Sequence, residues 1–414
     1  MSESVRPPSP VPYPHRVNIR AGPALLAGAD GGPSLAAHWA RYGSTPAVDL
    51  PALVDLVERV GLRGRGGAAF PFAAKLRAAA SGRHPLVVVN LSEGEPSSAK
   101  DAALAMTSPH LVLDGALGAA GALGAREVHL VLPGERAAVR NQMRQAVAER
   151  TERVRFRLHT ASPRFVSGQT RAVIELMSGR PNLPVTAWSP EAVAGYRGRP
   201  TLLSNAETWA HVGLLLHVGP AAYARHGTPE EPGTALLTVT VHGAAPDVWE
   251  VPFGTRLSAV LPRPDSGAAA LVGGYHGAWA MLDQLADVPV SVSGMARAGL
   301  PLGAGIVYIL DPSRCPLAFT WAVVDYLAGQ SAGRCGPCVN GLPALAASIQ
   351  ALLTGHDEAE RLDQLARSVA GRGACAHPDG TARLVRSVFT ALPEEVAAHR
   401  RGRCVARRSS LAPV

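Results

Sequence analysis

The chain has 414 residues, a formal net charge of +8 and five cysteines, and these counts already limit its class. The length predicts two to four domains, because a single hydrophobic core stops growing well below this size. The positive charge is nearly all arginine, since Lys75 and Lys100 are the only lysines, and it is scattered except in His399–Arg408. Nucleic-acid-binding proteins usually concentrate basic and aromatic residues in one patch, so the composition argues against that class.

The sequence pattern gives no sign of a secretory signal or a membrane span. Met1–Asn18 lacks the apolar stretch of a signal peptide. The uncharged run Ser266–Leu282 is too short and too rich in glycine to span a bilayer. We therefore expect a cytoplasmic protein that is not integral to a membrane, with its cysteines reduced or bound to metal.

The first half of the chain predicts an N-terminal extension followed by an α/β domain. Residues 1–45 open with repeated prolines, which remove amide donors and favour an extended arm. Residues 46–225 alternate between helix and strand, which is typical of a mostly parallel sheet. The clearest expected elements are helices at 51–60, 73–80 and 135–150 and strands at 85–90 and 128–132.

The second half predicts two further modules and a basic tail. Residues 226–312 form a small α+β module, with strands expected at 234–242, 248–252 and 305–310, another ending at Val272, and a helix beginning at Thr255. Residues 313–400 are expected to form a helical bundle, with helices at 317–328, 342–353, 358–369 and 382–392. The basic tail is residues 401–414.

The first motif with chemical content is the glycine-rich loop Gly61–Gly67, which leads through Phe70 and Pro71 into a helix. Glycines let backbone amides approach an anion closely, and the N-terminus of the following helix adds partial positive charge. Arg63, Arg65 and Lys75 could add charge-assisted hydrogen bonds to phosphate. The loop alone is equally compatible with a plain turn.

The second motif is Asn90-Leu-Ser-Glu-Gly-Glu-Pro96, at the carboxyl end of the predicted strand 85–90. Ligands of open α/β sheets bind at this end of the strands. Its amide and two carboxylates could bind hydroxyls and ring nitrogens. Taken alone, the motif reads as a polar turn.

The third motif is the cysteine spacing Cys335-Gly-Pro-Cys338, followed by the distant Cys375. Two thiolates in a C-x-x-C loop point at one metal, and a distant cysteine can complete the shell. A thioredoxin-type redox pair is the alternative, but the strand-then-helix setting that it requires is missing. Cys315 and Cys404 have no such spacing and are expected to be free thiols.

The ordered set of motifs resembles one family. GLRGRGGAAFP, NLSEGEP with Lys100-Asp101, SPH at Ser108–His110, SNAET at Ser204–Thr208 and CGPC with a distant cysteine follow one another as in the flavin- and NADH-binding subunit of respiratory complex I. Soluble NAD-linked hydrogenases and formate dehydrogenases contain the same subunit type. The resemblance covers about residues 45–400. It implies a Rossmann-like flavin domain, a ubiquitin-like β-grasp (SLBB) module and a helical bundle with a [4Fe-4S] cluster.

The resemblance also implies a reaction and a set of site residues. Hydride would pass from NADH to FMN, and single electrons would then pass to the cluster and to a partner such as a ferredoxin or a [2Fe-2S] subunit. Glu95 would bond the nucleotide ribose, Glu93 would face the flavin, and these two are the expected catalytic residues. Phe70 would stack on the nucleotide. The remaining cofactor contacts would be Gly64, Arg65, Gly66, Gly67, Lys75, Asn90, Ser92, Gly168 and Asn205, and the metal ligands would be Cys335, Cys338 and Cys375.

This sequence departs from the family pattern at four places. Ala332 stands where the family has a cluster cysteine, which leaves one iron without a thiolate. The acidic pair of the family's flavin loop is replaced by Gln169-Thr170, with Arg171 after it. Ala78 replaces a second aromatic, and Ser92 replaces an aspartate. The cluster could then be [3Fe-4S], or [4Fe-4S] completed by water, Ser331, His377 or a remote cysteine, or it could be absent.

Three functions follow from these observations. The first is an NADH-oxidising FMN enzyme that passes electrons to a protein partner. The second is an FMN electron-transfer subunit without a nicotinamide substrate, which would work with a ferredoxin; Gln169, Thr170 and Ala78 motivate it. The third is a cofactor-poor scaffold subunit that docks through its β-grasp module.

Overall fold

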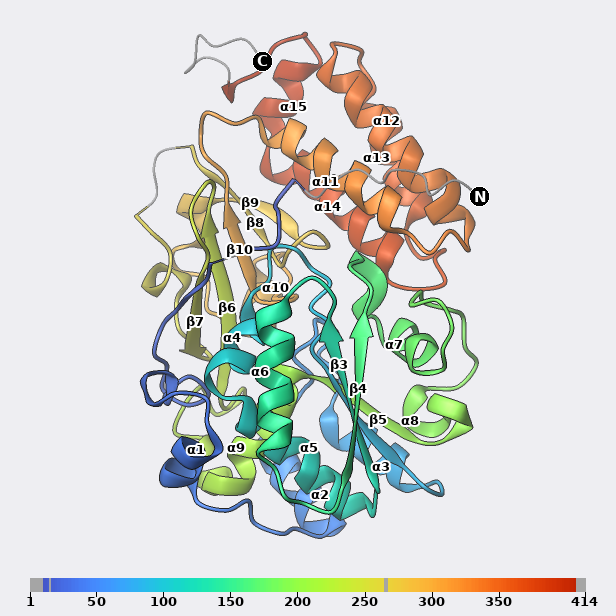
Figure 1. The fold of residues 1–414 in the computed structure, drawn as a ribbon. Coiled ribbons are helices and arrows are strands. Elements are labelled where there is room, and N and C mark those ends of the chain that lie inside the picture. Colours follow the sequence, from blue (N-terminus) through green and yellow to red (C-terminus); the bar gives the residue numbers. More distant parts are fainter. Residues whose placement is uncertain (1–9, 15, 264–266, 407–414) are drawn as a thin grey trace.

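The computed structural model describes residues 10–14, 16–263 and 267–406. A four-stranded parallel sheet in the order β4-β3-β2-β5 forms the first layer, and Figure 1 shows it below the C-terminal helices. Its strands are β2 (Leu86–Asn90), β3 (Glu127–Pro133), β4 (Arg155–Ala161) and β5 (Thr201–Asn205). The helices of this domain are α2 (Leu50–Arg59), α3 (Phe72–Ala80), α4 (Lys100–Thr107), α5 (Pro109–Leu123), α6 (Ala137–Ala148), α7 (Thr170–Met177), α8 (Glu191–Ala194) and α9 (Ala206–Tyr223).

Two glycines allow α5 and α9 to cross in close contact. A Cβ atom added at Gly115 would lie 2.0 Å from the carbonyl oxygen of Trp209, and one at Gly213 would lie 2.1 Å from that of Leu111. No real side chain tolerates such a distance, so only glycine permits this approach. The two helices bury much of the domain's core, which includes Trp209.

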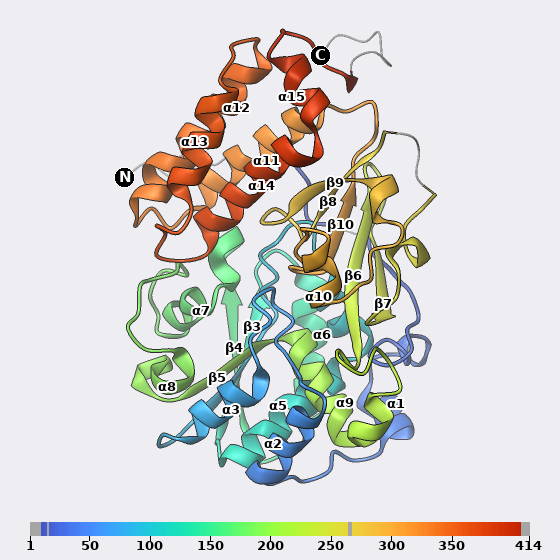
Figure 2. The same ribbon diagram turned by 180° about the vertical axis from the view of Figure 1, so that it is seen from behind.

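A six-stranded mixed sheet forms the second layer, in the order β1-β7-β6-β10-β8-β9. Figure 2 shows it beside the parallel sheet and beneath the bundle. Its strands are β1 (Asn18–Ile19), β6 (Thr234–Val241), β7 (Asp247–Pro252), β8 (Ala269–Val272), β9 (Ala278–Met281) and β10 (Ile306–Ile309), and the module also contains α10 (Val292–Arg297). The prediction of a helix that begins at Thr255 is wrong, because only a 3₁₀ turn, Leu257–Ala259, forms there.

The N-terminal segment is more ordered than the expected extended arm. Its β1 strand pairs with β7, and the buried carboxylate of Glu250 accepts the backbone N–H groups of Ala24, Leu25 and Leu26. Helix α1 (Leu35–Tyr42) follows, capped by the Ser34 side chain. The prolines that argued against helix all precede these elements, so they do not oppose them.

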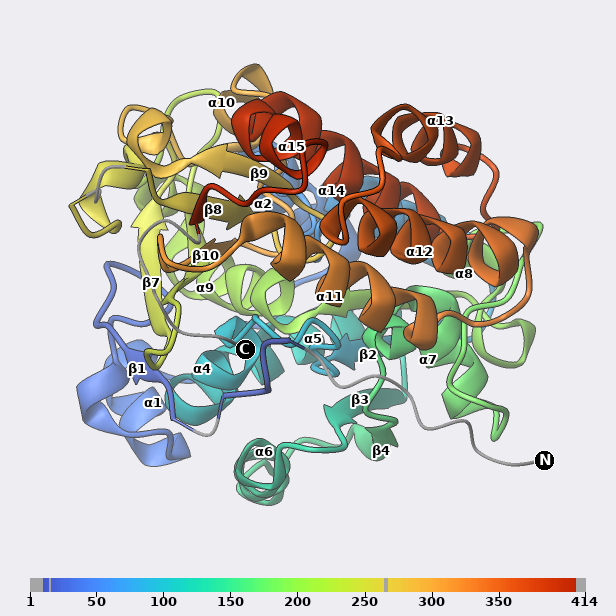
Figure 3. The ribbon, with the colours of Figure 1, turned by 90° about the horizontal axis from the view of Figure 1, so that it is seen from above.

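Five helices form the C-terminal bundle, which lies over one end of both sheets (Figure 3). They are α11 (Pro316–Gln330), α12 (Leu342–Leu353), α13 (Ala359–Val369), α14 (His377–Ala391) and α15 (Pro393–His399). Their apolar faces share one core with Tyr275 and Trp279 of the mixed-sheet module. The predicted combination of an α/β domain, a β-rich module and a helical bundle is confirmed. Within the described ranges, every helix is too short or too polar to cross a bilayer.

Candidate functional site

A cavity of about 790 Å³ lies where the parallel sheet, the mixed-sheet module and the bundle meet. This volume is within the range of small-molecule and cofactor sites. The carboxyl ends of β2 and β5 open onto it, as ligand sites of parallel sheets require. Its wall contains these residues predicted from the sequence: Gly66, Gly67, Asn90, Ser92, Glu93, Glu95, Gly168, Asn205 and Cys375.

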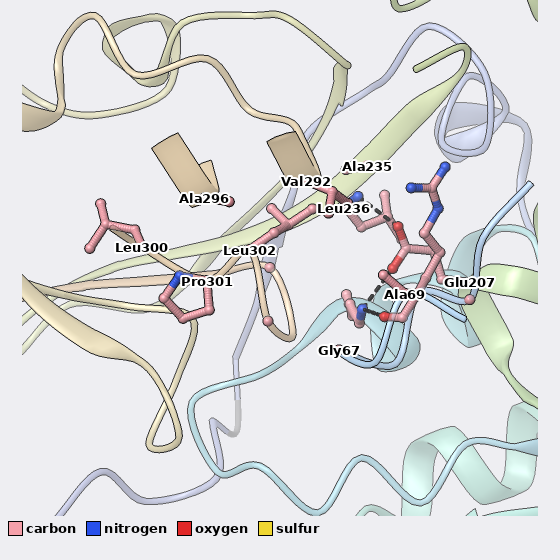
Figure 4. A pocket seen from close by; sticks show the side chains of 15 residues that line it. Gly67, Ala69, Glu207, Ala235, Leu236, Val292, Ala296, Leu300, Pro301 and Leu302 are labelled. Carbon is pink, nitrogen blue, oxygen red and sulfur yellow. Dashed lines mark hydrogen bonds and ion pairs between the residues drawn. The ribbon is translucent and has the colours of Figure 1, made fainter. Parts of the chain in front are cut away.

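Four other predicted residues line two smaller cavities beside it. One of about 120 Å³ contains Gly64, Phe70 and Lys75. The other, of about 180 Å³, contains Arg65 and Gly64; Figure 4 shows Glu207 and Leu236 on one side of it and Pro301 on the other. The phenyl ring of Phe70 is about half exposed, at 51%. The 120 Å³ cavity that Phe70 lines shares Gly66, Asn90, Gly168 and Asn205 with the 790 Å³ cavity, so the two cavities adjoin.

The glycine-rich loop is held by backbone hydrogen bonds. The Gly64 N–H donates to the Phe70 carbonyl, and the Arg65 N–H donates to Thr208 Oγ1. Gly67 has φ +96°, a conformation that disfavours any side chain. The Arg65 guanidinium lies over the Phe253 ring at 4.3 Å, so this cation packs against the mixed-sheet module.

The two lysines have different partners, and Lys100 is the one that contacts the glycine-rich loop. Lys75 Nζ lies 3.1 Å from both Glu191 Oε1 and the Leu203 carbonyl. Lys100 Nζ donates to the Arg65 carbonyl at 2.6 Å and to Glu207 Oε2 at 2.7 Å. The Lys100–Glu207 ion pair is almost completely buried. It fixes the loop to α4 and α9.

Asn90 and Ser92 join two loops at the cavity wall. Asn90 Nδ2 donates to the Gly168 carbonyl at 2.8 Å, and its Oδ1 accepts from the Ser92 hydroxyl at 2.7 Å. A Cβ atom at Gly168 would lie 2.7 Å from Ser92 Oγ. The serine that replaces the family's aspartate therefore has a defined partner, and Gly168 is the residue that lets these loops approach.

The carboxylate of Glu93 is already fully engaged. It pairs with Arg136 and accepts hydrogen bonds from the Ser98 hydroxyl and from the N–H groups of Asp101 and Ala102. The last two are donors at the start of α4. Glu93 thus anchors this helix at the cavity wall, and its predicted catalytic role stays a prediction.

Glu95 is the cavity carboxyl whose protonation changes near neutral pH. It accepts from the Tyr275 N–H at 2.9 Å and from the Ser97 hydroxyl at 2.8 Å. Burial nevertheless raises the pKa of Glu95 to about 7, because the hydrogen bonds offset only part of the desolvation. The carboxyl at this position therefore carries a proton for much of the time at neutral pH.

The Glu95→Gln variant is expected to remove a pH dependence of stability. Since the folded pKa of about 7 lies above the ordinary 4.5, the folded state binds the proton more tightly. The proton on Glu95 therefore stabilises the folded state fully below pH 4.5, and this stabilisation is lost as the pH rises through 7. As the pH rises between these limits, the free energy of unfolding of the variant should therefore increase by up to about 3 kcal/mol relative to that of the wild type. Denaturant unfolding at a series of pH values measures the difference, and a difference that stays constant with pH would contradict it.

Two buried polar atoms at the cavity have no partner among the described residues. Asn205 caps α9 through its Oδ1, which leaves the Nδ2 donor unsatisfied. Asp101 Oδ1 is likewise a buried acceptor without a donor, and burial followed by the nearby Glu93 charge raises the pKa of Asp101. Buried polar groups are rarely left unpaired. A bound group with both hydrogen-bond donors and acceptors, as in the FMN ring and ribityl chain, would satisfy both.

Of the three predicted metal ligands, Cys375 lines the cavity, and the charges of Cys335 and Cys375 act on the nearby Cys338. Cys335 precedes the π-helical turn Pro337–Gly341 and Cys338 lies within it, just before α12, and Cys375 lies two residues before α14. Burial opposes ionisation of Cys335, but the N–H groups of Ala374 and Cys338 at its sulfur lower its pKa below the ordinary value. Burial and then the Cys335 charge raise the pKa of Cys338 to about 12. Two amide donors at one sulfur are typical of a site that stabilises thiolate ligands.

The structure limits the source of a fourth cluster ligand. Cys315 precedes α11 and Cys335 follows it, and a helix of 15 residues is about 22 Å long. Cys404 lies beside Cys315, so neither remote cysteine can reach the other three. His377 is buried, with one ring nitrogen 2.9 Å from the Leu327 carbonyl and the other 3.1 Å from His276. Ser331 or water would then complete the coordination of the fourth iron of a [4Fe-4S] cluster.

Sequence reasoning missed several residues that shape the site. Glu207 and Asp101 are buried there, and a charged residue in each of the otherwise apolar helices α9 and α4 was the available signal. Arg136, which precedes α6 and pairs with Glu93, gave no such signal. Gln169 was noted in the sequence because it replaces an acidic residue, but its contact was not predicted. Its side chain forms a hydrogen bond with the Cys375 sulfur while lining the same cavity, so it connects the flavin loop to the cysteine cluster.

Comparison with known proteins supports this arrangement. The family model described as Nuo51 FMN-binding domain matches residues 57–214, and that of the NADH-ubiquinone oxidoreductase-F iron-sulfur binding region matches residues 318–399. One NADH-quinone oxidoreductase F subunit of Rhizobium meliloti is 27% identical over 371 residues, covering 84% of this chain and 88% of that protein. The Escherichia coli F subunit is 28% identical over 369 residues, with 83% of each chain covered. The crystal structure of an air-oxidised NAD+-reducing [NiFe]-hydrogenase is similar with a TM-score of 0.81 and 28% identity, over 92% of this chain and 67% of that one.

Proposed function

We propose a function from the premise that the chain belongs to the family of NADH- and FMN-binding subunits of NADH-quinone oxidoreductases and NAD-linked hydrogenases. In this function the protein oxidises NADH at bound FMN and delivers single electrons to an iron–sulfur cluster. The observation that carries the proposal is the shared cavity. Its wall contains both the Asn90–Pro96 loop and Cys375, so flavin and cluster would be neighbours.

The residues present fit FMN, and three thiols fit a cluster with one incomplete ligand position. FMN supplies the conversion of a two-electron donor to one-electron steps. In this proposal Gly66, Gly67 and the adjoining amides would hold the phosphate region, and Asn205 Nδ2 would donate to the cofactor. Asp101 and Glu95 would set the protonation of the wall. Cys335, Cys338 and Cys375 would bind the cluster.

The partner and location belong to the same proposal. A protein electron acceptor is expected, and a ferredoxin or a [2Fe-2S] protein matches the one-electron chemistry of the cluster. The reduced thiols expected from the sequence fit the cytoplasm.

Anaerobically purified, FMN-loaded protein is expected to reduce an artificial dye with NADH as donor. The flavin bands should bleach when NADH is added, because hydride transfer reduces the ring before any acceptor is needed. Dye reduction and bleaching are measured with NADH and with NADPH in parallel. If neither donor works in protein with full flavin occupancy, this function is wrong.

A second function, FMN electron transfer without a nicotinamide substrate, is favoured by two observations. Gln169 and Thr170 replace acidic side chains at the cavity, and Ala78 stands where the family has a second aromatic residue. The same preparation separates the two functions. Tight FMN binding with no heat of NADH or NADPH binding in calorimetry would select the second one.

A further inference from the structure

A second group of metal-binding side chains lies at the far end of α11 from Cys335, and the reaction above does not use it. Cys315 precedes α11, Glu395 and His399 belong to α15, and Cys404 follows α15. One ligand atom from each of these four residues lies within 4.8 Å of all the others. The sequence spacing alone had assigned Cys315 and Cys404 to free thiols.

The other three ligand atoms surround Glu395 Oε1. This oxygen lies 3.2 Å from the Cys315 sulfur, 3.1 Å from the Cys404 sulfur and 2.9 Å from His399 Nε2. The Cys315 sulfur is also 3.3 Å from His399 Nε2. Ligand atoms bound tetrahedrally to zinc lie about 3.3–3.8 Å apart. These four distances differ from the tetrahedral values by about half an ångström or less, and the other two ligand-atom distances are within 4.8 Å.

The local structure holds each ligand in place. Glu395 and His399 are four residues apart on α15, so they share one face of the helix. The Ala318 N–H donates to the Cys315 sulfur at 3.3 Å, because Cys315 caps α11. The Val405 N–H donates to the second oxygen of Glu395 at 3.1 Å, which leaves Oε1 toward the group. Such outer hydrogen bonds are typical of metal ligands.

The charge balance also suits a divalent cation. Glu395 and His399 are each only 5% exposed. Two thiolates, one carboxylate and a neutral imidazole around a divalent ion would leave one negative charge. Arg401 and Arg403 lie in the adjoining segment and would offset this charge, whereas Arg400 is paired with Asp357.

We propose that Cys315, Glu395, His399 and Cys404 form a structural zinc site that fastens the C-terminal segment to the start of α11. Sulfur and imidazole ligands favour zinc over magnesium or calcium. Four protein ligands leave no open position, which is typical of a structural site. The two thiol protons pass to solvent as the metal binds. The site would join the mixed-sheet module, which ends just before Cys315, to the last helix of the bundle.

The test is metal analysis of the full-length protein, purified anaerobically without chelators and with zinc supplied. About one zinc per chain is expected, and X-ray absorption at the zinc edge should show two sulfur neighbours at about 2.3 Å. The Cys404→Ala variant should lose the zinc and keep its iron and flavin. The matched control Cys335→Ser should lose iron and keep zinc.

A second measurement follows the thermal stability of the protein. A chelator should remove zinc from the wild-type protein and lower its melting temperature, and the chelator should not change that of Cys404→Ala. Three results would overturn the proposal: no zinc in protein to which zinc was supplied, zinc retained in both Cys315→Ala and Cys404→Ala, or a Cys315–Cys404 disulfide in the anaerobic protein by mass spectrometry.

Discussion

The Cys335→Ser and Cys338→Ser variants are expected to lose bound iron and the broad visible absorption of a cluster while the flavin bands persist. Cys335, Cys338 and Cys375 are the three proposed thiolate ligands, so removing one leaves two, too few to retain an iron–sulfur cluster. NADH-driven reduction of a protein acceptor should fall to background. Reduction of a small dye, which can take electrons from the flavin directly, should continue.

Two comparisons make this prediction specific. Cys404→Ser should keep its iron, because Cys404 lies beyond the other end of α11. Ala332→Cys should raise the iron content per chain, because it restores a thiolate where the fourth iron lacks one. Iron and sulfide analysis with absorption spectra measures all of these variants. Unchanged cluster absorption in both Cys335→Ser and Cys338→Ser would show that the ligands lie elsewhere.

The Lys100→Met variant is expected to lower the free energy of unfolding by about 3–5 kcal/mol. Lys100 and Glu207 are 6% and 2% exposed, so the variant would leave a carboxylate buried with only the Leu236 N–H as a partner. Its flavin content should also fall, since Lys100 holds the Arg65 carbonyl of the glycine-rich loop. Denaturant unfolding and flavin analysis of the purified protein test both effects.

Two controls separate the buried charge from the loss of a side chain. The double variant Lys100→Met with Glu207→Gln should recover part of the stability, because no unpaired charge remains. Arg59→Met breaks the exposed pair with Asp55 and should cost less than about 1 kcal/mol. Equal losses in Lys100→Met and Arg59→Met would refute the assignment of Lys100 as a buried anchor.

The sequence predicted the elements whose patterns are continuous. Strand 85–90 was expected from its run of valines, and helix 342–353 from its apolar spacing, and both formed close to those bounds. The prediction of an extended arm over residues 1–45 is wrong for Leu35–Tyr42, which form a helix. The repeated prolines that favoured an extended arm all precede this helix. The 3₁₀ turn near Thr255 was mistaken for a helix, because one turn and a full helix begin with the same signals.

The sequence predicted which residues line the candidate site better than it predicted their contacts. The ordered motifs placed Asn90, Gly168, Asn205 and Cys375 in one region, and one cavity contains them all. Spacing could not show that Arg65 packs against Phe253, because that partner lies in another module. Nor could it bring Cys315 to Cys404, which are far apart in the chain and close only through the packing of α15 on α11.

The N-terminal arm has a consequence for how the protein is made. Val11 N–H donates to the Tyr275 hydroxyl, and the Tyr13 hydroxyl donates to the Gly94 carbonyl in the cavity loop. During synthesis the first of these residues emerges long before Tyr275, so the arm cannot dock until most of the chain has been translated. Such pairing of distant segments is slow to form. We expect the cavity to reach its final shape only late in folding, so cofactor loading would be a post-translational step.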